Sequence, residues 1–175
     1  MRLFPAYSDA MPPKTALDRF DFALLDLVQR DNQIPARLLA EKVGLSESAA
    51  LRRLRRLRRD KVIAADVSIV RPEAIGLPLT IVALVSMERE SASALDAFAR
   101  RARARPEVRR CWYVTGEADW VLVLQLASMA DYEAFTREMF LADPNVRAFR
   151  TLVAMREAVG EGEERRPLAP PGPQP

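Results

Sequence analysis

Apolar residues recur at helical spacing in three stretches of the first third of the chain, and this pattern predicts three helices. Asp18 is placed to cap the first helix, and Pro35 suits the first turn of the second. Gly44 can end the second helix in a left-handed conformation. Ser46 can then cap a third helix that runs to about Arg59. Three short helices with these connections are typical of a helix-turn-helix.

The pattern changes period after the third helix. Val62–Ile63 and Val67–Val70 are rich in β-branched residues, so we expect them to form a two-stranded wing. Pro72, Gly76 and Pro78 then mark a hinge between two domains.

The second half of the chain alternates between strand and helix patterns. Strands are predicted at Leu79–Met87, Val108–Val114, Trp120–Ala127 and Val146–Met155. One helix follows Ser91, and another carries an apolar stripe from Tyr132 to Phe140. The order βαββαβ is that of a ferredoxin-like sandwich, so the fold class expected is α+β with an N-terminal winged helix-turn-helix.

The expected organisation has four parts. Residues 1–14 are expected to form a flexible arm, residues 15–75 a winged helix-turn-helix domain and residues 76–159 a ferredoxin-like αβ domain. Residues 160–175 form a Pro-rich tail that lacks the apolar content of a core and is expected to be disordered.

Charge divides the chain in the same way. Residues 15–75 hold twelve Lys and Arg against nine Asp and Glu, whereas residues 76–159 hold eleven of each. A basic module joined to a neutral one is typical of a nucleic-acid-binding domain linked to a sensing or assembly domain. No apolar stretch is long enough to span a bilayer and no secretory signal is apparent, and the single cysteine fits a cytoplasmic location.

The third helix carries the strongest functional signal. Counted at about 100° per residue from Leu51, the apolar positions lie on one side and the polar and basic positions on a face between about 40° and 200°. Short side chains at the start of such a helix let it approach base edges, and arginine can contact guanine or phosphate. The alternative is a solvated helix face. The candidate DNA-binding residues are Ser46, Ser48, Ala49, Arg52, Arg53, Arg55, Arg56 and Arg59. We expect Arg53→Ala and Arg56→Ala to lower DNA affinity while the fold stays intact.

An ordered set of motifs from Leu17 to Val159 resembles the Lrp/AsnC family of bacterial and archaeal regulators. The motifs include residues 17–21, 39–46 and 111–120, followed by Pro144–Val146 and Arg150–Thr151. The resemblance implies an αβ domain that dimerises by joining sheets, dimers that associate into octamers or larger rings, and a small effector, commonly an amino acid, bound between dimers. The loop positions that it implies for the effector are Thr115, Gly116, Glu117, Ala118 and Asp119.

Three positions depart from the family pattern. Lys61 stands where a glycine is usual, and lysine adopts a left-handed conformation only at a cost, so the turn there is expected to differ. Arg52 and Arg58 stand where acidic residues are common, so we expect stronger nonspecific affinity for DNA. Arg58 itself lies off the basic face, toward the expected wing.

Other interpretations stay open at this point. The loop at residues 115–119 could be an ordinary hairpin connection in which Asp119 caps backbone amides. Trp112, Tyr113 and Trp120 could wall a ligand pocket, although core or interface packing is the more common role of aromatic residues on strands.

The whole protein could also be an effector-independent architectural factor that wraps DNA, or its second domain could serve assembly alone. An enzyme such as a sirohaem decarboxylase is a remote alternative. The chain has no histidine and shows neither metal-spaced ligands nor a phosphate-binding loop, so we expect no catalytic residues, no metal and no cofactor.

Overall fold

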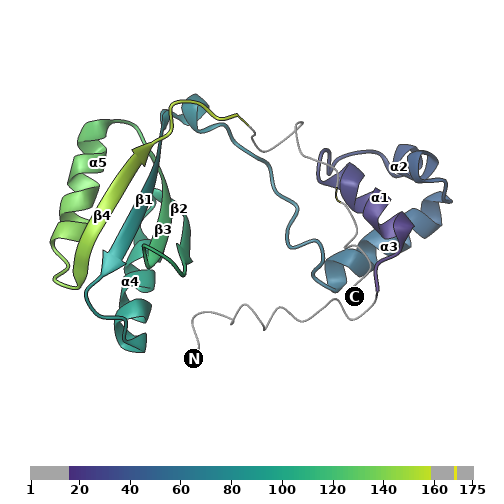
Figure 1. The fold of residues 1–175 in the computed structure, drawn as a ribbon. Coiled ribbons are helices and arrows are strands. Elements are labelled where there is room, and N and C mark those ends of the chain that lie inside the picture. The colour runs from purple at the N-terminus through teal and green to yellow at the C-terminus, as the bar shows by residue number, and fades with distance from the viewer. Residues whose placement is uncertain (1–15, 159–167, 169–175) are drawn as a thin grey trace. The chain divides into compact units, whose positions relative to one another are not determined.

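A computed structural model of the chain describes residues 16–158 and Leu168, and it contains two compact units (Figure 1). The first unit comprises the described residues up to Ile69 together with Ala158 and Leu168, and the second comprises Val70–Glu157. The division after Ile69 comes earlier than the boundary expected after residue 75. The expected arm and tail lie outside the described residues, with Leu168 as the exception.

The first unit contains the three expected helices. They are α1 (Arg19–Val28), α2 (Ala36–Val43) and α3 (Glu47–Arg59). Their apolar faces meet in one core, which includes Leu24, Leu39, Ala50, Leu54 and Leu57. The predicted helix-turn-helix is therefore present in the structure.

Local sequence explains where these helices begin and end. The Asp18 carboxylate accepts hydrogen bonds from the backbone amides of Phe20 and Asp21, and the Asp21 side chain accepts one from the Asp18 amide. This reciprocal capping box satisfies amides that would otherwise lack partners at the start of α1. Gly44 ends α2 with a φ of 74°, and Ser46 caps α3, as predicted. Pro35 is the residue before α2 rather than part of its first turn.

The predicted two-stranded wing is wrong. The described residues between Lys61 and Val70 contain no strand. The amides of Val62 and Ile63 both donate to the Leu57 carbonyl, so this pair closes the end of α3 instead of pairing with residues 67–70. The residues between the two segments also lack the glycine or asparagine that a tight hairpin favours.

Lys61 adopts the left-handed backbone conformation that glycine usually supplies at this position. Its φ is 59°, and it is the one described non-glycine residue with a positive φ. The Lys61 amide donates to the Arg58 carbonyl while Val62 donates to Leu57, which is the hydrogen-bond pattern of a Schellman motif. The turn therefore forms despite the lysine.

The second unit has the βαββαβ order expected from the sequence. After a short 3₁₀ turn at Pro72–Ile75, its elements are β1 (Leu79–Met87), α4 (Ala92–Ala104), β2 (Val108–Tyr113), β3 (Trp120–Leu126), α5 (Met129–Thr136) with a π-helical turn at Arg137–Leu141, and β4 (Val146–Val153). All strand pairs are antiparallel, in the order β2-β3-β1-β4. This arrangement confirms the ferredoxin-like topology.

The two faces of this sheet differ. One face is covered by α4 and α5, and alternate residues of β1 and β3 are buried there against Phe98 and Phe135. The other face carries the intervening apolar residues of β1 and β3. On this face Val82 lies opposite Val123, and Leu84 lies opposite Val121. Nothing among the described residues of this unit covers that second face, which we call the open face.

Candidate DNA-binding surface and effector loop

The buried apolar residues of α3 determine which side of the helix faces the core and which side faces solvent. Ala50, Leu54 and Leu57 are buried in the core of the first unit. The Ser46 hydroxyl accepts a hydrogen bond from the Ala49 amide, at 3.3 Å, and so orients the first turn. Because the apolar positions are fixed, each remaining side chain of α3 has a defined direction.

The predicted basic face divides into two parts. Ser48, Arg52, Arg55 and Arg59 are exposed and lie within about 60° of one another around the helix. We call these four residues the solvent stripe. Arg52 and Arg55 form no ion pair with any described residue, and Arg59 pairs only with its neighbour Asp60, with 73% of its side chain exposed. The stripe therefore presents three arginines and one short hydroxyl to solvent.

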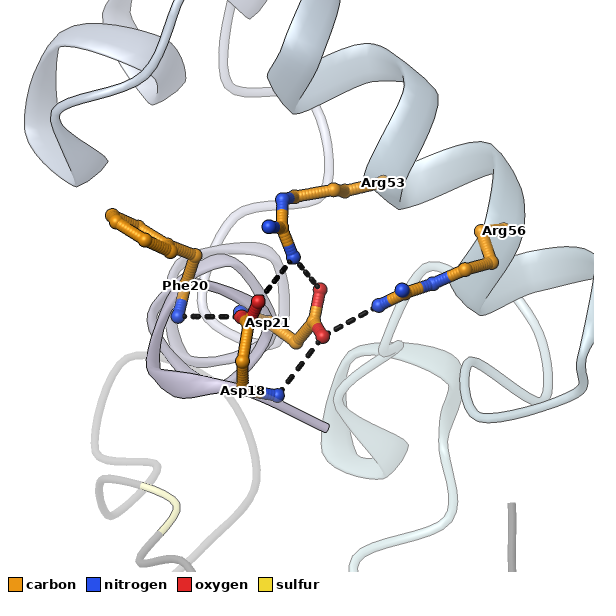
Figure 2. A network of polar contacts seen from close by, with 5 residues as sticks. All are labelled: Asp18, Phe20, Asp21, Arg53 and Arg56. Atoms are coloured by element: carbon orange, nitrogen blue, oxygen red, sulfur yellow. Dashed lines mark hydrogen bonds and ion pairs between the residues drawn. The ribbon is translucent and has the colours of Figure 1, made fainter. Parts of the chain in front are cut away.

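Arg53 and Arg56 belong to the other part, which faces α1. Arg53 Nη1 donates to Asp18 Oδ2 at 2.8 Å and to Asp21 Oδ1 at 2.9 Å, and Arg56 Nη2 donates to Asp21 Oδ2 at 2.5 Å. Figure 2 shows both guanidinium groups reaching from α3 to the carboxylates at the start of α1. We call these four residues the acidic clasp: Asp18, Asp21, Arg53 and Arg56.

Burial differs across the acidic clasp. The Asp21 side chain is 1% exposed, the two arginine side chains are 24% and 26% exposed, and that of Asp18 is 47% exposed. Breaking a buried ion pair leaves an uncompensated charge, and the cost is largest for the member with no access to water. Asp21 is therefore the fixed centre of the acidic clasp, and Asp18 is its solvent-facing member.

The pKa values of the acidic clasp follow from these contacts. Desolvation raises the pKa of the Asp18 carboxyl group, but the hydrogen bond from the Asp21 amide and the interaction with Arg53 lower it, so the net pKa lies below its ordinary value. The hydrogen bond to Asp21 raises the pKa of Arg53 above its ordinary value despite partial desolvation. Both groups are thus held in their charged forms.

Arg58 lies away from the solvent stripe, as the sequence predicted. Its Nε and Nη2 donate to the two oxygens of Asp66 at 2.8 and 3.0 Å, in the segment that follows α3. The hydrogen bond with Arg58 lowers the pKa of Asp66. The bidentate pair fixes the segment where a wing had been expected.

The candidate effector loop joins β2 and β3. Thr115, Gly116 and Glu117 are exposed, whereas Ala118 and Asp119 are half-buried. Gly116 has a φ of 133°, and a Cβ at this position would have no atom within 4 Å, so backbone conformation rather than space favours glycine here.

Asp119 connects the loop to β1. Its Oδ2 accepts a hydrogen bond from the Met87 amide at 2.6 Å, and its own amide donates to the Val85 carbonyl. Met87 lies at the point where the register between β1 and β4 shifts. The Asp119 carboxylate thus satisfies an amide at an irregular point of the sheet, which is the capping role considered for it from the sequence.

Glu117 extends the loop toward β4. Its carboxylate forms an ion pair with Arg150 at 2.7 Å, and its carbonyl accepts a hydrogen bond from the Ser86 hydroxyl. A cavity of about 540 Å³ occurs instead in the first unit, between the end of α1 and residues 62–69, and none of the loop residues lines it.

The three aromatic residues beside the loop have different surroundings. Trp120 is fully buried and packs against Phe98, with ring centroids 5.1 Å apart. Tyr113 packs on Trp120, and its hydroxyl donates to Glu90. Trp112 is 44% exposed and pairs with Val121, which places it on the open face. Packing therefore accounts for Trp120 and Tyr113.

No group of three or more potential ligands among residues 16–158 and Leu168 could hold a metal ion. No helix of this part of the chain is long and apolar enough to cross a membrane.

Both units match known protein domains. Residues 17–58 match the AsnC-type helix-turn-helix domain, and residues 80–163 match the Lrp/AsnC ligand binding domain. An uncharacterised HTH-type transcriptional regulator of Sinorhizobium fredii is 48% identical over 79% of this chain and 82% of its own length. The chain belongs to the Lrp/AsnC family of transcriptional regulators.

Further relatives agree with this assignment. A leucine-responsive regulatory protein of Rhizobium meliloti is 33% identical to this Lrp/AsnC-family chain, over 84% of the chain and 94% of its own length. A transcriptional regulator of Neisseria meningitidis, solved as a complex with L-Met, superimposes with a TM-score of 0.78 at 28% identity, covering 83% of this chain and 94% of its own. These relatives are regulators rather than enzymes, and the family assignment confirms the resemblance found in the sequence.

The sequence of this Lrp/AsnC-family regulator did not lead us to the two aspartates of the acidic clasp, Asp18 and Asp21, as partners of the arginines of α3. Asp18 was recognised only as a helix cap, and Asp21 was not singled out. Their spacing of three residues places both at the start of α1, which was a usable signal. The sequence carried no signal that Arg53 and Arg56 are their partners, because helical periodicity does not show which neighbouring helix each side of α3 faces.

Proposed function

We propose that this Lrp/AsnC-family regulator reads DNA through the solvent stripe of α3. The observation that carries the proposal is the concentration of three exposed arginines on one arc of the helix, with the exposed Ser48 beside them. Arginine side chains on one helix face suit the major groove, where they can contact guanine edges or neighbouring phosphates.

The remaining candidates have supporting roles in this proposal. Ser46 caps α3, and Ala49 is a small, half-buried residue near its start, so both would help the helix approach the groove. Arg53 and Arg56 hold α3 against α1 through the acidic clasp. Replacing either arginine would therefore disturb the fold as well as any contact with DNA, so Arg53→Ala and Arg56→Ala are ambiguous tests.

Arg55→Ala is the clearer test of the DNA-binding surface. Binding of the full-length protein to duplex DNA is measured across a range of salt concentrations by fluorescence anisotropy. We expect weaker binding and a salt slope smaller by about 1, because one phosphate contact is removed. Arg100→Ala is the matched control, since Arg100 is an exposed helical arginine of α4 with no ion pair to any described residue. Equal binding by the two variants would refute the assignment of the solvent stripe.

We further propose that the protein acts as a homodimer that joins its sheets, with octamers as a higher assembly. Trp112 and Leu152 on the open face are 44% and 54% exposed, and apolar residues of β1 and β3 lie between them. A second copy would bury this area, which water otherwise covers. Sedimentation velocity of Leu84→Lys should show smaller species than the wild type, whereas Leu141→Lys, at a residue 68% exposed after α5, should not.

The effector proposed is an amino acid or a related metabolite, bound near residues 115–119 at a junction between dimers. The L-Met complex of the Neisseria meningitidis regulator and the leucine-responsive relative support this class of ligand. A regulator of this class meets the chromosome in the cytoplasm, which is the location we infer.

Thermal unfolding followed by tryptophan fluorescence tests the effector. Trp112 and Trp120 both belong to the second unit, so the signal reports the proposed sensing domain alone. A ligand that binds the folded state raises its apparent melting temperature, and each proteinogenic amino acid is tried in turn. A saturable rise would identify the effector. No rise with any of them would favour the alternative, an effector-independent protein that organises DNA.

A further inference from the structure

Two of the seven basic residues between Ser46 and Lys61 form ion pairs with carboxylates at the start of α1. Both oxygens of Asp21 are engaged, Oδ1 by Arg53 and Oδ2 by Arg56. Asp18 adds a second carboxylate to Arg53. The charge that α3 offers to DNA is thus smaller than its sequence suggests.

We infer that Asp18 and Asp21 are specificity-determining residues, which hold Arg53 and Arg56 off the DNA backbone and so restrain affinity for arbitrary sequences. The inference rests on the proposed function of the solvent stripe. Affinity for arbitrary DNA comes from neutralised phosphates, and each additional arginine that reaches one strengthens binding to every sequence alike. Base contacts, by contrast, favour only the correct site.

Asp18 is the member of the acidic clasp that makes the inference testable. Asp18 is 47% exposed and Arg53 24%, so this pair borders on solvent while Asp21 lies inside. Without the charge of Asp18, Arg53 keeps only its contact with Asp21, and its guanidinium group can turn toward a phosphate. A carboxylate at the surface of the domain also repels phosphate directly.

A purely structural role for Asp18 can be separated from this one. Its Oδ1 caps α1, while its Oδ2 holds Arg53. Asparagine caps helices about as well as aspartate but carries no charge. Asp18→Asn therefore preserves the cap and removes the hold on Arg53.

The experiment compares Asp18→Asn with Asp26→Asn in the full-length protein. Asp26 lies on the same helix and pairs with Arg30 at 3.0 Å, so its replacement changes the net charge equally without touching α3. The probe is a duplex of mixed sequence, titrated at several salt concentrations. We expect Asp18→Asn to bind it about three- to tenfold more tightly near 0.1 M salt, with a slope steeper by about 1. Asp26→Asn should keep the wild-type slope.

A second variant tests the cause of that change. Adding Arg53→Gln to Asp18→Asn should return the slope to that of the wild type, because the freed guanidinium group is gone. Far-UV circular dichroism checks that each variant retains its helices. Equal slopes for Asp18→Asn and Asp26→Asn, or a double variant that keeps the steeper slope, would overturn the inference.

The Arg55→Ala variant separates this inference from the proposed function. If Arg55→Ala weakens binding while Asp18→Asn behaves like Asp26→Asn, only the inference fails. If Arg55→Ala leaves binding unchanged, the solvent stripe and the inference fail together. Selection of a preferred site from a random library then allows the ratio of specific to nonspecific affinity to be measured, and this ratio should fall in Asp18→Asn.

Discussion

Replacing Asp21 with asparagine should selectively destabilise the first unit. The Asp21 carboxylate is 1% exposed and accepts hydrogen bonds from two guanidinium groups and from the Asp18 amide. Hydrogen bonds to charged groups contribute about 1.5–3 kcal/mol each, so two would contribute roughly 3–6 kcal/mol. Asparagine retains one acceptor, and the arginines keep partial access to water, which reduces the expected loss in unfolding free energy to about 2–3 kcal/mol.

The two units can be followed separately in one sample. Far-UV circular dichroism reports helices of both units, whereas tryptophan fluorescence reports only the second, which contains Trp112 and Trp120. For a domain of this size about 1 kcal/mol corresponds to roughly 4–8 °C, so Asp21→Asn should shift part of the dichroism transition downward by on the order of 10–20 °C. The fluorescence transition should stay in place.

The control again uses Asp26, whose i,i+4 pair with Arg30 is partly exposed and should contribute only about 0.2–0.5 kcal/mol. If Asp21→Asn and Asp26→Asn unfold within about 2 °C of each other by dichroism, the acidic clasp does not stabilise the unit and the reasoning from burial is wrong. A shift of both probes together would show instead that the two units unfold as one.

Three further predictions concern single groups. Lys61→Gly should raise the unfolding free energy of the first unit by about 0.5–1 kcal/mol, because glycine relieves the left-handed strain at a small entropic cost; a lower melting temperature by dichroism would contradict this. The pKa values of Asp18 and Asp66 lie below 3.8, so their stabilising contribution is present above about pH 4 and disappears as the pH falls through the folded-state values. Acid titration should therefore destabilise the wild type more than a variant with asparagine at both positions. Burial raises the pKa of the Cys111 thiol from 9.0 to about 11, so iodoacetamide at pH 8 should modify it about 100-fold more slowly in the native than in the unfolded chain, as followed by mass spectrometry.

Much of the fold could be predicted because single residues mark its boundaries. Asp18, Gly44, Ser46 and Ser91 each stand where the structure begins or ends a helix, and β1 has the predicted bounds. Caps and alternation are local properties of the chain, so the sequence alone carries them.

The wing shows what local properties leave out. β-branched residues at positions 67–70 favour an extended backbone, but a strand also needs a partner. Val62 and Ile63, the expected partners, use their amides on Leu57. The β-propensity of residues 67–70 predicted their extended conformation, but it could not predict that no strand would be available to accept and donate their backbone hydrogen bonds.

The sequence predicted one basic face on α3, and the structure divides that face into two parts. Periodicity separated the buried side from the polar side, but the polar side includes the flank that faces α1. Only the three-dimensional packing distinguishes Arg53 and Arg56, held by carboxylates, from Arg52 and Arg55 in the solvent stripe.

The contact between Asp119 and Met87 gives this carboxylate a structural task in addition to the effector contact proposed for it. Oδ2 accepts a hydrogen bond from the Met87 amide and so anchors the loop to the sheet, whereas Oδ1 would be the oxygen that contacts the cationic group of the proposed effector. An alanine here would remove the anchor and the charge together, and its phenotype would have two causes. Asparagine keeps a carbonyl oxygen for the amide and removes only the charge. Comparing Asp119→Asn with Asp119→Ala therefore separates the effect of losing the hydrogen bond to Met87 from the effect of losing the negative charge.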